Sequence, residues 1–365
     1  MIEKKLSDYI DINPATKLEK GKCYPFVEME NIVVGIKRPI TENMLIFAGQ
    51  SCSKFKPNDT LMARITPCLE NGKVVKYSNG NAGFGSTEFI DYVYYLAKSQ
   101  YIRDMAINSM TGASGRQRAD AKFIGKIKWN FPSLNIQTKI ASILSSYDDL
   151  IENNNKRIKI LEQMAENLYK EWFVRFRIPG YQTAEFENGI PKGWKVVRVK
   201  NCLKRLPFNR LCKQDELESS GKVIVIDQSS NEFMGFHNNE PSHYASFEDP
   251  IILFGDHSCK FVLMTKNFSL GENVVPFRSI NTEELDNYYL YYAVHKLIVT
   301  EEYKRHWGRF TAMKFFKPQI NLQKKFAEFV KQLVHKKEML WIQNQNLIKQ
   351  RDLLLPRLMS GKLEV

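Results

Sequence analysis

The chain has 365 residues, of which 43% are hydrophobic and 25% are charged, as in ordinary water-soluble proteins with a packed core. At about 150 residues per domain, this length predicts two to three domains. Lysine and arginine number 53 against 40 aspartates and glutamates, and the excess is +7 over residues 1–180 and +6 over residues 181–365. A basic charge spread over both halves favours a polyanionic partner, with nucleic acid first.

The sequence argues against membrane insertion, secretion and a zinc site of paired cysteines. No apolar run approaches the roughly 18 residues that a membrane-spanning helix requires, and the N-terminus MIEKKLSDYI has no apolar signal segment. The six cysteines lie at least 10 residues apart, which indicates free thiols and not CxxC ligand pairs. We therefore expect a cytoplasmic protein.

Residues 1–134 are expected to form a first domain of mixed α/β structure. Strand-like apolar runs occur at KVVKY (73–77) and FIDYVYYLA (89–97), with Gly, Asn and Ser between them. A long helix is expected over 135–175, because neither Gly nor Pro interrupts this stretch after Gln137.

A second mixed α/β domain is expected over 176–319, and a second long helix over 320–365. The segment 175–194 is rich in turn-forming residues and joins the first helix to this domain. Strand-like runs in the second domain are KVIVI (222–226), PIILF (250–254) and KFVLM (260–264).

A short repeat relates the two halves of the chain. PSLNIQTKIA (132–141) and PQINLQKKFA (318–327) share five of ten residues at an offset of 186. The helices that follow carry apolar residues at heptad spacing in the same phase, which favours a two-helix coiled coil. A twofold relation between the halves would make the two helices antiparallel. The alternative is two separate amphipathic helices packed on different cores.

The expected helix seam has ten heptad positions. Flanking positions are expected to widen it, and they are fewer on the second helix: Ile143, Leu144, Leu150, Ile151, Ile158, Met164, Ala165 and Trp172 on the first helix and Phe329, Val330 and Leu358 on the second. Asn154 is the single polar member, and either a buried asparagine that fixes the register or a solvent-reaching side chain fits the pattern. The ten positions are Ile140, Tyr147, Asn154, Leu161 and Leu168 in the first helix and Phe326, Leu333, Leu340, Leu347 and Leu354 in the second.

No catalytic motif is evident. The sequence has no GxxxxGK[ST] phosphate-binding loop, no GxGxxG after a strand and no Asn/Asp-Pro-Pro-aromatic motif for a flipped base. AGFGST (82–87) is interpreted as a loop. Asp256-His257 has no nucleophile elbow beside it, so a structural or DNA-contacting role is favoured over acid–base catalysis.

The chain resembles the specificity subunits of Type I restriction–modification enzymes along its whole length and in the same order. One departure is Ser258-Cys259-Lys260, where that family often has Thr-Arg after the histidine. The segments that carry the resemblance are NPATKLEKGKCYPFVEMENI (13–32), DTLMARITPCLENGK (59–73), GFGSTEF (83–89), IPKGWKVVRV (190–199), LFGDHSCKF (253–261) and RDLLLPRLMSGKLEV (351–365).

The resemblance implies an α+β fold with two α/β target recognition domains, separated by two long α-helices packed as an antiparallel coiled coil, and an internal pseudo-twofold repeat. It implies a non-catalytic subunit in which each domain reads one half of an asymmetric, two-part DNA target. The helices would separate the domains and dock two modification (methyltransferase) subunits, which restriction (translocase–nuclease) subunits would join. S-adenosylmethionine, ATP and Mg²⁺ would bind to those partners and not to this chain.

Candidate DNA-binding residues lie on loops and before the two helices. Lys and Arg pair with phosphates, Arg can also read guanine, and Asn or Gln can read adenine. For each residue the alternative is a solvated surface charge, and the turn at Arg64 suits a structural role equally well. The candidates are Arg64, Asn71, Lys73, Arg116, Gln117 and Arg118 in the first domain and His257, Lys260, Arg309, Thr311 and Lys314 in the second.

Two other functions stay open from the sequence. A coiled-coil scaffold or RNA-binding protein would show a preference for structured RNA over duplex DNA. A fusion in which one domain is a cryptic nuclease or methyltransferase would bind its cofactor as an isolated chain.

Overall fold

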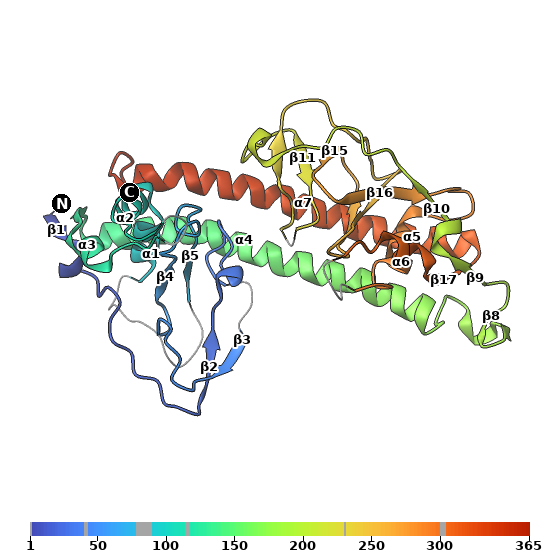
Figure 1. Ribbon diagram of the computed structural model, residues 1–365, viewed down its shortest axis with the longest axis horizontal. Coiled ribbons are helices and arrows are strands. Elements are labelled where there is room, and N and C mark those ends of the chain that lie inside the picture. Colours follow the sequence, from blue (N-terminus) through green and yellow to red (C-terminus); the bar gives the residue numbers. More distant parts are fainter. Residues whose placement is uncertain (1, 40–42, 78–89, 114–116, 230, 300–303) are drawn as a thin grey trace. The chain divides into compact units, whose positions relative to one another are not determined.

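The computed structural model describes residues 2–39, 43–77, 90–113, 117–229, 231–299 and 304–365. It is a mixed helix and sheet structure in two compact units, of which the first comprises Met1–Lys156 and Leu340–Val365 and the second Arg157–Met339. Two long helices, α4 (Leu134–Tyr169) and α7 (Ile320–Met359), each contribute one segment to each unit (Figure 1).

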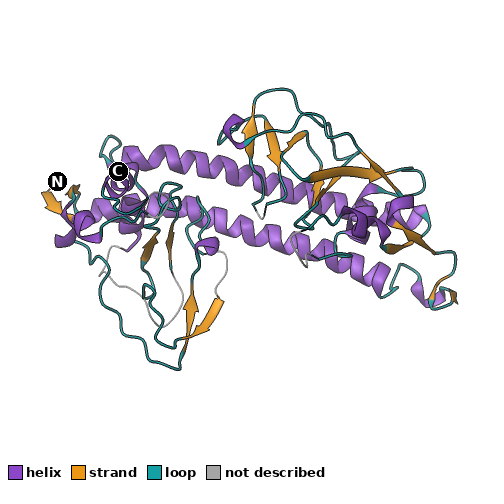
Figure 2. Cartoon of the chain, in the orientation of Figure 1, coloured by secondary structure: helices purple, strands orange, loops and turns teal. Residues whose placement is uncertain are grey.

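The described part of the first unit contains three two-stranded antiparallel sheets and three short helices beside its segments of the long helices (Figure 2). The strand pairs are β1 (Ile2–Lys5) with β6 (Lys128–Phe131), β2 (Cys23–Phe26) with β3 (Asn43–Ile46), and β4 (Thr60–Met62) with β5 (Val74–Lys76). The short helices are α1 (Ile90–Lys98), α2 (Gln100–Asn108) and α3 (Ala121–Lys126).

The second unit is richer in sheet. Its four-stranded sheet has the order β10 (Leu203–Arg205), β16 (Val274–Ser279), β13 (Ile251–Gly255) and β14 (Phe261–Met264). A three-stranded sheet has the order β12 (Gly235–His237), β11 (Val223–Ile226) and β15 (Phe268–Leu270), with β11 and β15 parallel. The remaining elements are β7 (Phe186–Glu187) with β8 (Ile190–Pro191), β9 (Lys195–Arg198) with β17 (Lys314–Lys317), α5 (Asn287–Val294) and α6 (Trp307–Ala312).

Strand prediction succeeded where short apolar runs are flanked by turn formers. The runs at 73–77, 222–226, 250–254 and 260–264 correspond to β5, β11, β13 and β14. All residues of β11 and β13 are buried, which explains why both are continuous apolar runs and not alternating ones.

The predicted strand at 89–97 is wrong, because its described residues form helix α1. Tyr92, Tyr95 and Leu96 are buried on the helix face that packs in the core, at the three- and four-residue spacing of a helix. A short aromatic run satisfies both a strand and a buried helix, and packing in the unit decides between them. AGFGST (82–87), like GFGSTEF (83–89), lies outside the described residues.

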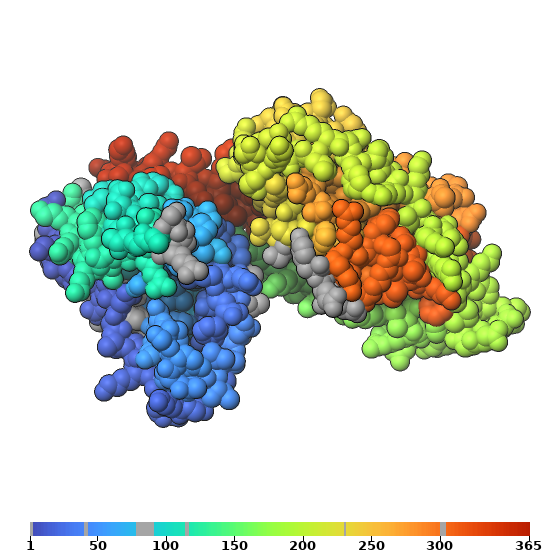
Figure 3. Space-filling view, in the orientation of Figure 1, coloured from blue at the N-terminus to red at the C-terminus, as the bar shows by residue number. Residues whose placement is uncertain are grey.

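The cores of the two units differ in composition. In the first unit, Tyr92 and Tyr95 of α1 pack with Leu144 of α4 and Leu355 and Leu358 of α7. In the second unit, aromatic side chains dominate, and most of their rings meet edge to face. Its aromatic members include Trp172, Phe173, Phe254, Phe277, Tyr289, Phe310 and Phe326. In the space-filling view, segments coloured from yellow-green to orange form most of the visible surface of the second unit (Figure 3).

The helices α4 and α7 contact each other within each unit. In the first unit Asn154 is buried and donates hydrogen bonds to Gln343 Oε1 (3.1 Å) and Asn344 Oδ1 (2.9 Å), and Asn344 donates to Asn155 Oδ1 (2.8 Å). Of the two interpretations of Asn154, the buried one is therefore confirmed, with Asn344 as its partner.

The heptad positions predicted for the seam are all buried or half-buried, and Ile140, Asn154, Phe326 and Leu340 are the most deeply buried of them. The expectation for the flanking positions is wrong for Ile143, Leu150, Met164 and Phe329, whose side chains are exposed. The other flanking positions are buried or half-buried: Leu144, Ile151, Ile158, Ala165, Trp172, Val330 and Leu358. A helix of 3.6 residues per turn drifts relative to a strict seven-residue repeat, so positions flanking the seam can turn to solvent.

A fully buried arginine ties the first unit together. Arg351 on α7 donates through Nη1 to Asp148 of α4 and to the Gly35 carbonyl oxygen (2.7 Å), while Tyr95 of α1 donates to the second Asp148 oxygen (2.5 Å). Both charged side chains are almost completely excluded from solvent. Three helices and one loop therefore depend on one ion pair.

We predict that Asp148→Ala destabilises the first unit by about 3–5 kcal/mol, because it removes the buried carboxylate of Arg351 and leaves the guanidinium with Asp352, a half-exposed carboxylate, as its partner. Calorimetric unfolding of the full chain measures this loss. Asp149→Ala is the matched control, since Asp149 is the exposed neighbour on the same helix, and its effect should stay within about 0.5 kcal/mol. Equal, small effects of both substitutions would contradict the assignment.

Candidate nucleic-acid interface

In the first unit, the candidate residues of two separate segments come together through backbone hydrogen bonds. The turn that joins β4 to β5 carries Arg64, Asn71 and Lys73, and Ala63 N–H donates to the Lys73 carbonyl (2.9 Å). The segment before α3 docks on this turn, because Ala119 N–H donates to the Arg64 carbonyl (2.8 Å). Thr66 N–H donates to the Gln117 carbonyl (3.2 Å), and Arg118 pairs with Ile65.

The side chains of this cluster differ in their exposure to solvent. Arg64, Asn71 and Arg118 are exposed, and Gln117 is half-buried. Lys73 is also half-buried, and its ammonium donates to the Met29 carbonyl (2.6 Å). At Arg64 the backbone makes structural hydrogen bonds, while the side chain reaches solvent. Arg116 lies outside the described residues.

In the second unit, Asp256 joins the loop after β13 to the start of α6. Its carboxylate oxygen Oδ1 accepts hydrogen bonds from the N–H groups of His306 (3.0 Å) and Trp307 (2.8 Å). The Trp307 N–H in the first turn of α6 thereby gains an acceptor, as in an N-cap, while the His306 N–H also donates to the Asp256 carbonyl oxygen (2.7 Å). This arrangement agrees with the structural role favoured for Asp256-His257, and it brings the 255–260 loop beside the α6 helix.

The candidates on this loop are partly held by neighbouring segments. His257 N–H donates to Gln228 Oε1 (3.0 Å), and the Lys260 ammonium donates to the carbonyl oxygens of Asp227 (3.5 Å) and Asn231. Burial lowers the pKa of Lys260. Lys260 thus stabilises the loop conformation and is a weaker phosphate ligand than an exposed lysine.

The remaining candidates lie on or just after α6. Arg309 is half-buried, and Thr311 donates its hydroxyl to the Gly308 carbonyl (3.1 Å). Lys314 is exposed at the start of β17. Asp256 therefore brings His257 near α6, whereas Lys314 belongs to the neighbouring two-stranded sheet.

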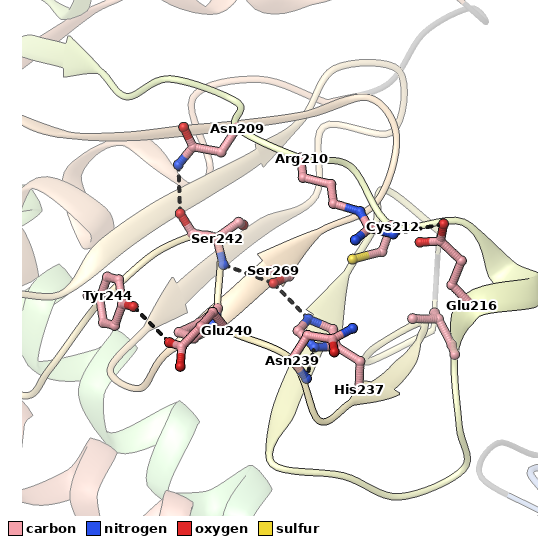
Figure 4. A pocket seen from close by; sticks show the side chains of 12 residues that line it. Asn209, Arg210, Cys212, Glu216, His237, Asn239, Glu240, Ser242, Tyr244 and Ser269 are labelled. Atoms are coloured by element: carbon pink, nitrogen blue, oxygen red, sulfur yellow. Dashed lines mark hydrogen bonds and ion pairs between the residues drawn. The ribbon is translucent and has the colours of Figure 1, made fainter.

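A pocket of about 410 Å³ in the second unit was not predicted from the sequence. Its rim carries the ion pair of Arg210 with Glu216 (3.0 Å) and the hydrogen bond from the Tyr244 hydroxyl to Glu240 (3.1 Å) (Figure 4). The polar run HNNEPSH (237–243) supplies much of the lining and is the signal that could have indicated it.

The chemistry of this pocket is that of a binding surface. His237 accepts a hydrogen bond from Asn239 N–H at Nδ1 (3.1 Å), so the neutral ring carries its proton on Nε2 and donates it to Ser269 Oγ (2.8 Å). An imidazole in this tautomer cannot take a proton from Ser269. Burial raises the pKa of Cys212, which disfavours the thiolate.

Within the described ranges, no group of three or more His, Cys, Asp or Glu side chains is arranged to hold a metal ion. Among these same residues, no helix is both long and apolar enough to cross a membrane.

Comparisons with known proteins agree with the resemblance. A family model described as "Type I restriction modification DNA specificity domain" matches residues 15–163. The Type I restriction enzyme MjaIX specificity subunit of Methanocaldococcus jannaschii is 28% identical over 316 residues, which covers 75% of this chain and 69% of that protein. The EcoEI specificity subunit of Escherichia coli is 28% identical over 131 residues, covering 31% of this chain and 22% of its own length.

Two solved structures also align along most of the chain. The Type I restriction–modification S subunit from M. genitalium has 16% identity and a TM-score of 0.49, with 98% of this chain and 95% of that chain covered. The HsdS subunit from Thermoanaerobacter tengcongensis has 13% identity and a TM-score of 0.39, with 99% and 97% covered.

The matched residues include the β4–β5 turn and the segment before α3, so the first unit resembles a DNA specificity domain. Over 75% of its length the chain is similar to a specificity subunit of a Type I restriction enzyme. The names of these relatives agree with the resemblance to specificity subunits.

We predict that Asp256→Ala destabilises the second unit by about 0.5–2 kcal/mol, because the Trp307 N–H loses its side-chain acceptor and the His306 N–H keeps the backbone carbonyl of residue 256 alone. Asp256→Asn keeps an acceptor oxygen and should retain most of the stability. Urea denaturation monitored by tryptophan fluorescence distinguishes the variants, since Trp307 begins α6. Equal losses for Ala and Asn would instead assign the effect to the charge.

Proposed function

We propose that this chain is the cytoplasmic, DNA-reading specificity subunit of a Type I restriction–modification complex. The observation that carries this proposal is the specificity-domain match over residues 15–163, which contains the clustered residues Arg64, Asn71, Gln117 and Arg118. The chain itself binds no cofactor in this proposal. S-adenosylmethionine, ATP and Mg²⁺ act on partner subunits.

Recognition in the first unit would use the exposed side chains of this cluster. Arg64 and Arg118 can hold phosphate or read the O6 and N7 acceptors of guanine, whereas Asn71 and Gln117 can read N6 and N7 of adenine. The segments that carry them are tied by backbone hydrogen bonds, so the side chains are presented from a fixed frame.

Recognition in the second unit would use different chemistry. Its candidate surface combines the 255–260 loop with α6 and offers His257, Arg309 and Thr311. Because the two surfaces are unlike in sequence, their half-sites would differ and the DNA target would be asymmetric. The target would be two short half-sites separated by unread base pairs.

The long helices would form the spacer between the two readers. We propose that α4 and α7 pair as an antiparallel coiled coil and that the chain has pseudo-twofold symmetry. In support of the pairing, Asn154 meets Asn344 in the first unit, and Glu162 meets Lys337 (2.7 Å) in the second. In each unit, residues with higher numbers on the first long helix contact residues with lower numbers on the second, as two antiparallel helices do.

The same helices would dock the modification subunits. On the first-unit segment of α4, Ile136, Ile143 and Leu150 are exposed at spacings of one heptad. An outward apolar stripe at this spacing suits a partner helix that packs along it. Two modification subunits would bind in this way, and restriction subunits would join that assembly.

The central experiment is methylome sequencing of cells that express this chain with its partner methyltransferase subunits. We predict one asymmetric, two-part methylated site. Inserting one heptad into both α4 and α7 should lengthen the unread gap and leave both half-sites unchanged, because seven residues preserve the apolar seam.

Insertion into α4 alone is the matched control, and it should misalign the seam and abolish methylation. A continuous or palindromic site would contradict the proposal. A change in the bases read, without a change in the gap, would contradict the division of labour between domains and helices.

We predict that replacing Arg116, Gln117 and Arg118 together by Ala weakens specific binding by about 1–3 kcal/mol for each good base contact that is lost, and relaxes specificity at that base. Fluorescence anisotropy with a duplex that carries the methylated sequence measures the affinity, and methylome sequencing measures the specificity. The control removes an equal charge at exposed Lys222 and Lys362. Unchanged affinity and an unchanged methylation pattern would show that this loop is only a connection between neighbouring elements.

A further inference from the structure

Each unit presents a pair of like charges directly opposite each other on a two-stranded sheet. In the first unit Lys5 of β1 pairs with Lys128 of β6, and in the second Arg198 of β9 pairs with Lys314 of β17. All four side chains are exposed. Residues directly opposite in an antiparallel pair point to the same face of the sheet, so each pair presents two cations side by side.

These pairs are poorly explained by the fold alone. Like charges opposite each other destabilise a strand pair. Lys128 is partly compensated by Glu3 (3.1 Å). Among the described residues, no carboxylate lies within 4.0 Å of the cationic groups of Lys5, Arg198 or Lys314. An anion that the chain does not supply would relieve the repulsion.

The pair occupies the same place in both units. Lys128 and Lys314 are 186 residues apart, the offset of the short sequence repeat. Each lies two residues after the end of a six-residue helix, α3 or α6. At the start of each helix an aspartate side chain accepts a backbone N–H. Asp120, the residue before α3, accepts from Lys122 N–H (2.8 Å), and Asp256, from the loop after β13, accepts from Trp307 N–H (2.8 Å).

The same short helix connects this pair to the candidate reading loop. Gln117 and Arg118 precede α3, and the 255–260 loop is held at the start of α6. A six-residue helix rises about 9 Å. Since B-DNA advances about 3.4 Å per nucleotide along one strand, this distance corresponds to roughly three base pairs.

We propose that the Lys5–Lys128 and Arg198–Lys314 pairs are phosphate clamps, each of which holds the duplex backbone about three base pairs from the bases read by the loop of the same unit. This inference rests on the proposed function and adds a binding site to it. Opposite side chains lie about 5 Å apart at Cβ, so both long side chains can reach phosphates of one strand. A phosphate contact positions the protein without reading sequence.

The test uses the full chain assembled with its methyltransferase subunits and a fluorescein-labelled mixed-sequence duplex of about 40 base pairs, because phosphate contacts also operate in non-specific binding. The variants are Lys5→Gln with Lys128→Gln, and Arg198→Gln with Lys314→Gln. The control, Lys222→Gln with Lys362→Gln, removes the same charge from exposed positions elsewhere.

Each clamp variant should lower the slope of log affinity against log salt by about 1.8, as expected for two lost phosphate contacts, and the control should not. The methylated sequence should stay the same. The melting temperature should stay close to that of the unaltered complex. Arg198→Gln with Lys314→Gln removes a repulsion, and Lys5→Gln with Lys128→Gln removes a repulsion together with the exposed Lys128–Glu3 ion pair. This last readout separates a lost contact from a folding defect.

Three results would overturn the inference. A salt slope equal to that of the control would show that the pairs do not touch phosphate. Weaker assembly with the methyltransferase subunits at an unchanged slope would assign the pairs to a protein interface. New self-association at an unchanged slope would show that the lysines protect strand edges. Failure of the proposed function is recognised separately, by the absence of a two-part methylation pattern in the unaltered complex.

Discussion

The first unit depends on placing one guanidinium where water cannot reach it. Burying the Arg351 charge is costly unless a carboxylate and further acceptors surround it. Asp148 and the Gly35 carbonyl meet this need, and Tyr95 completes the hydrogen bonding of Asp148. Because these groups come from α1, α4, α7 and a loop, the helices cannot slide past each other within this unit without stranding a buried charge. The polar contact of Asn154 with Asn344 adds a second constraint on the same register.

In the second unit, the corresponding constraint is a carboxylate at a helix start. The Asp256 carboxylate accepts from the N–H groups of His306 and Trp307 at the start of α6 and so joins a loop after a central strand to a short helix. The stacked rings of Phe254 and Phe310, with centroids 4.9 Å apart, stabilise the same junction. Loops that carry recognition residues need such anchoring, because a flexible loop loses conformational entropy on binding. The candidate surface is thus built on rigid elements, even though its residues lie on turns.

The similarity to specificity subunits and the chemistry of the side chains point to the same surfaces. The specificity-domain match covers the first unit's candidate cluster, and the second unit offers a different set of side chains. In the proposed function, these unlike surfaces would suit an asymmetric target. The pocket around His237 and Ser269 stands apart from this scheme, since the histidine tautomer and the burial of Cys212 provide no catalytic base or nucleophile.

Much of the architecture was determined locally and could be predicted. The long uninterrupted helices, the strands β5, β11, β13 and β14 and the family resemblance depend on short-range periodicity, turn formers and motifs. The helix at Ile90–Lys98, the outward direction of Ile143 and Leu150, and the docking of Gln117 beside Arg64 were decided only by the tertiary structure. So was the pairing of Asp148 with Arg351, which are 203 residues apart. The physical reason is that burial is a property of the packed unit: a local pattern shows that a side chain is apolar or charged, whereas distant segments determine whether it is covered and by which partner.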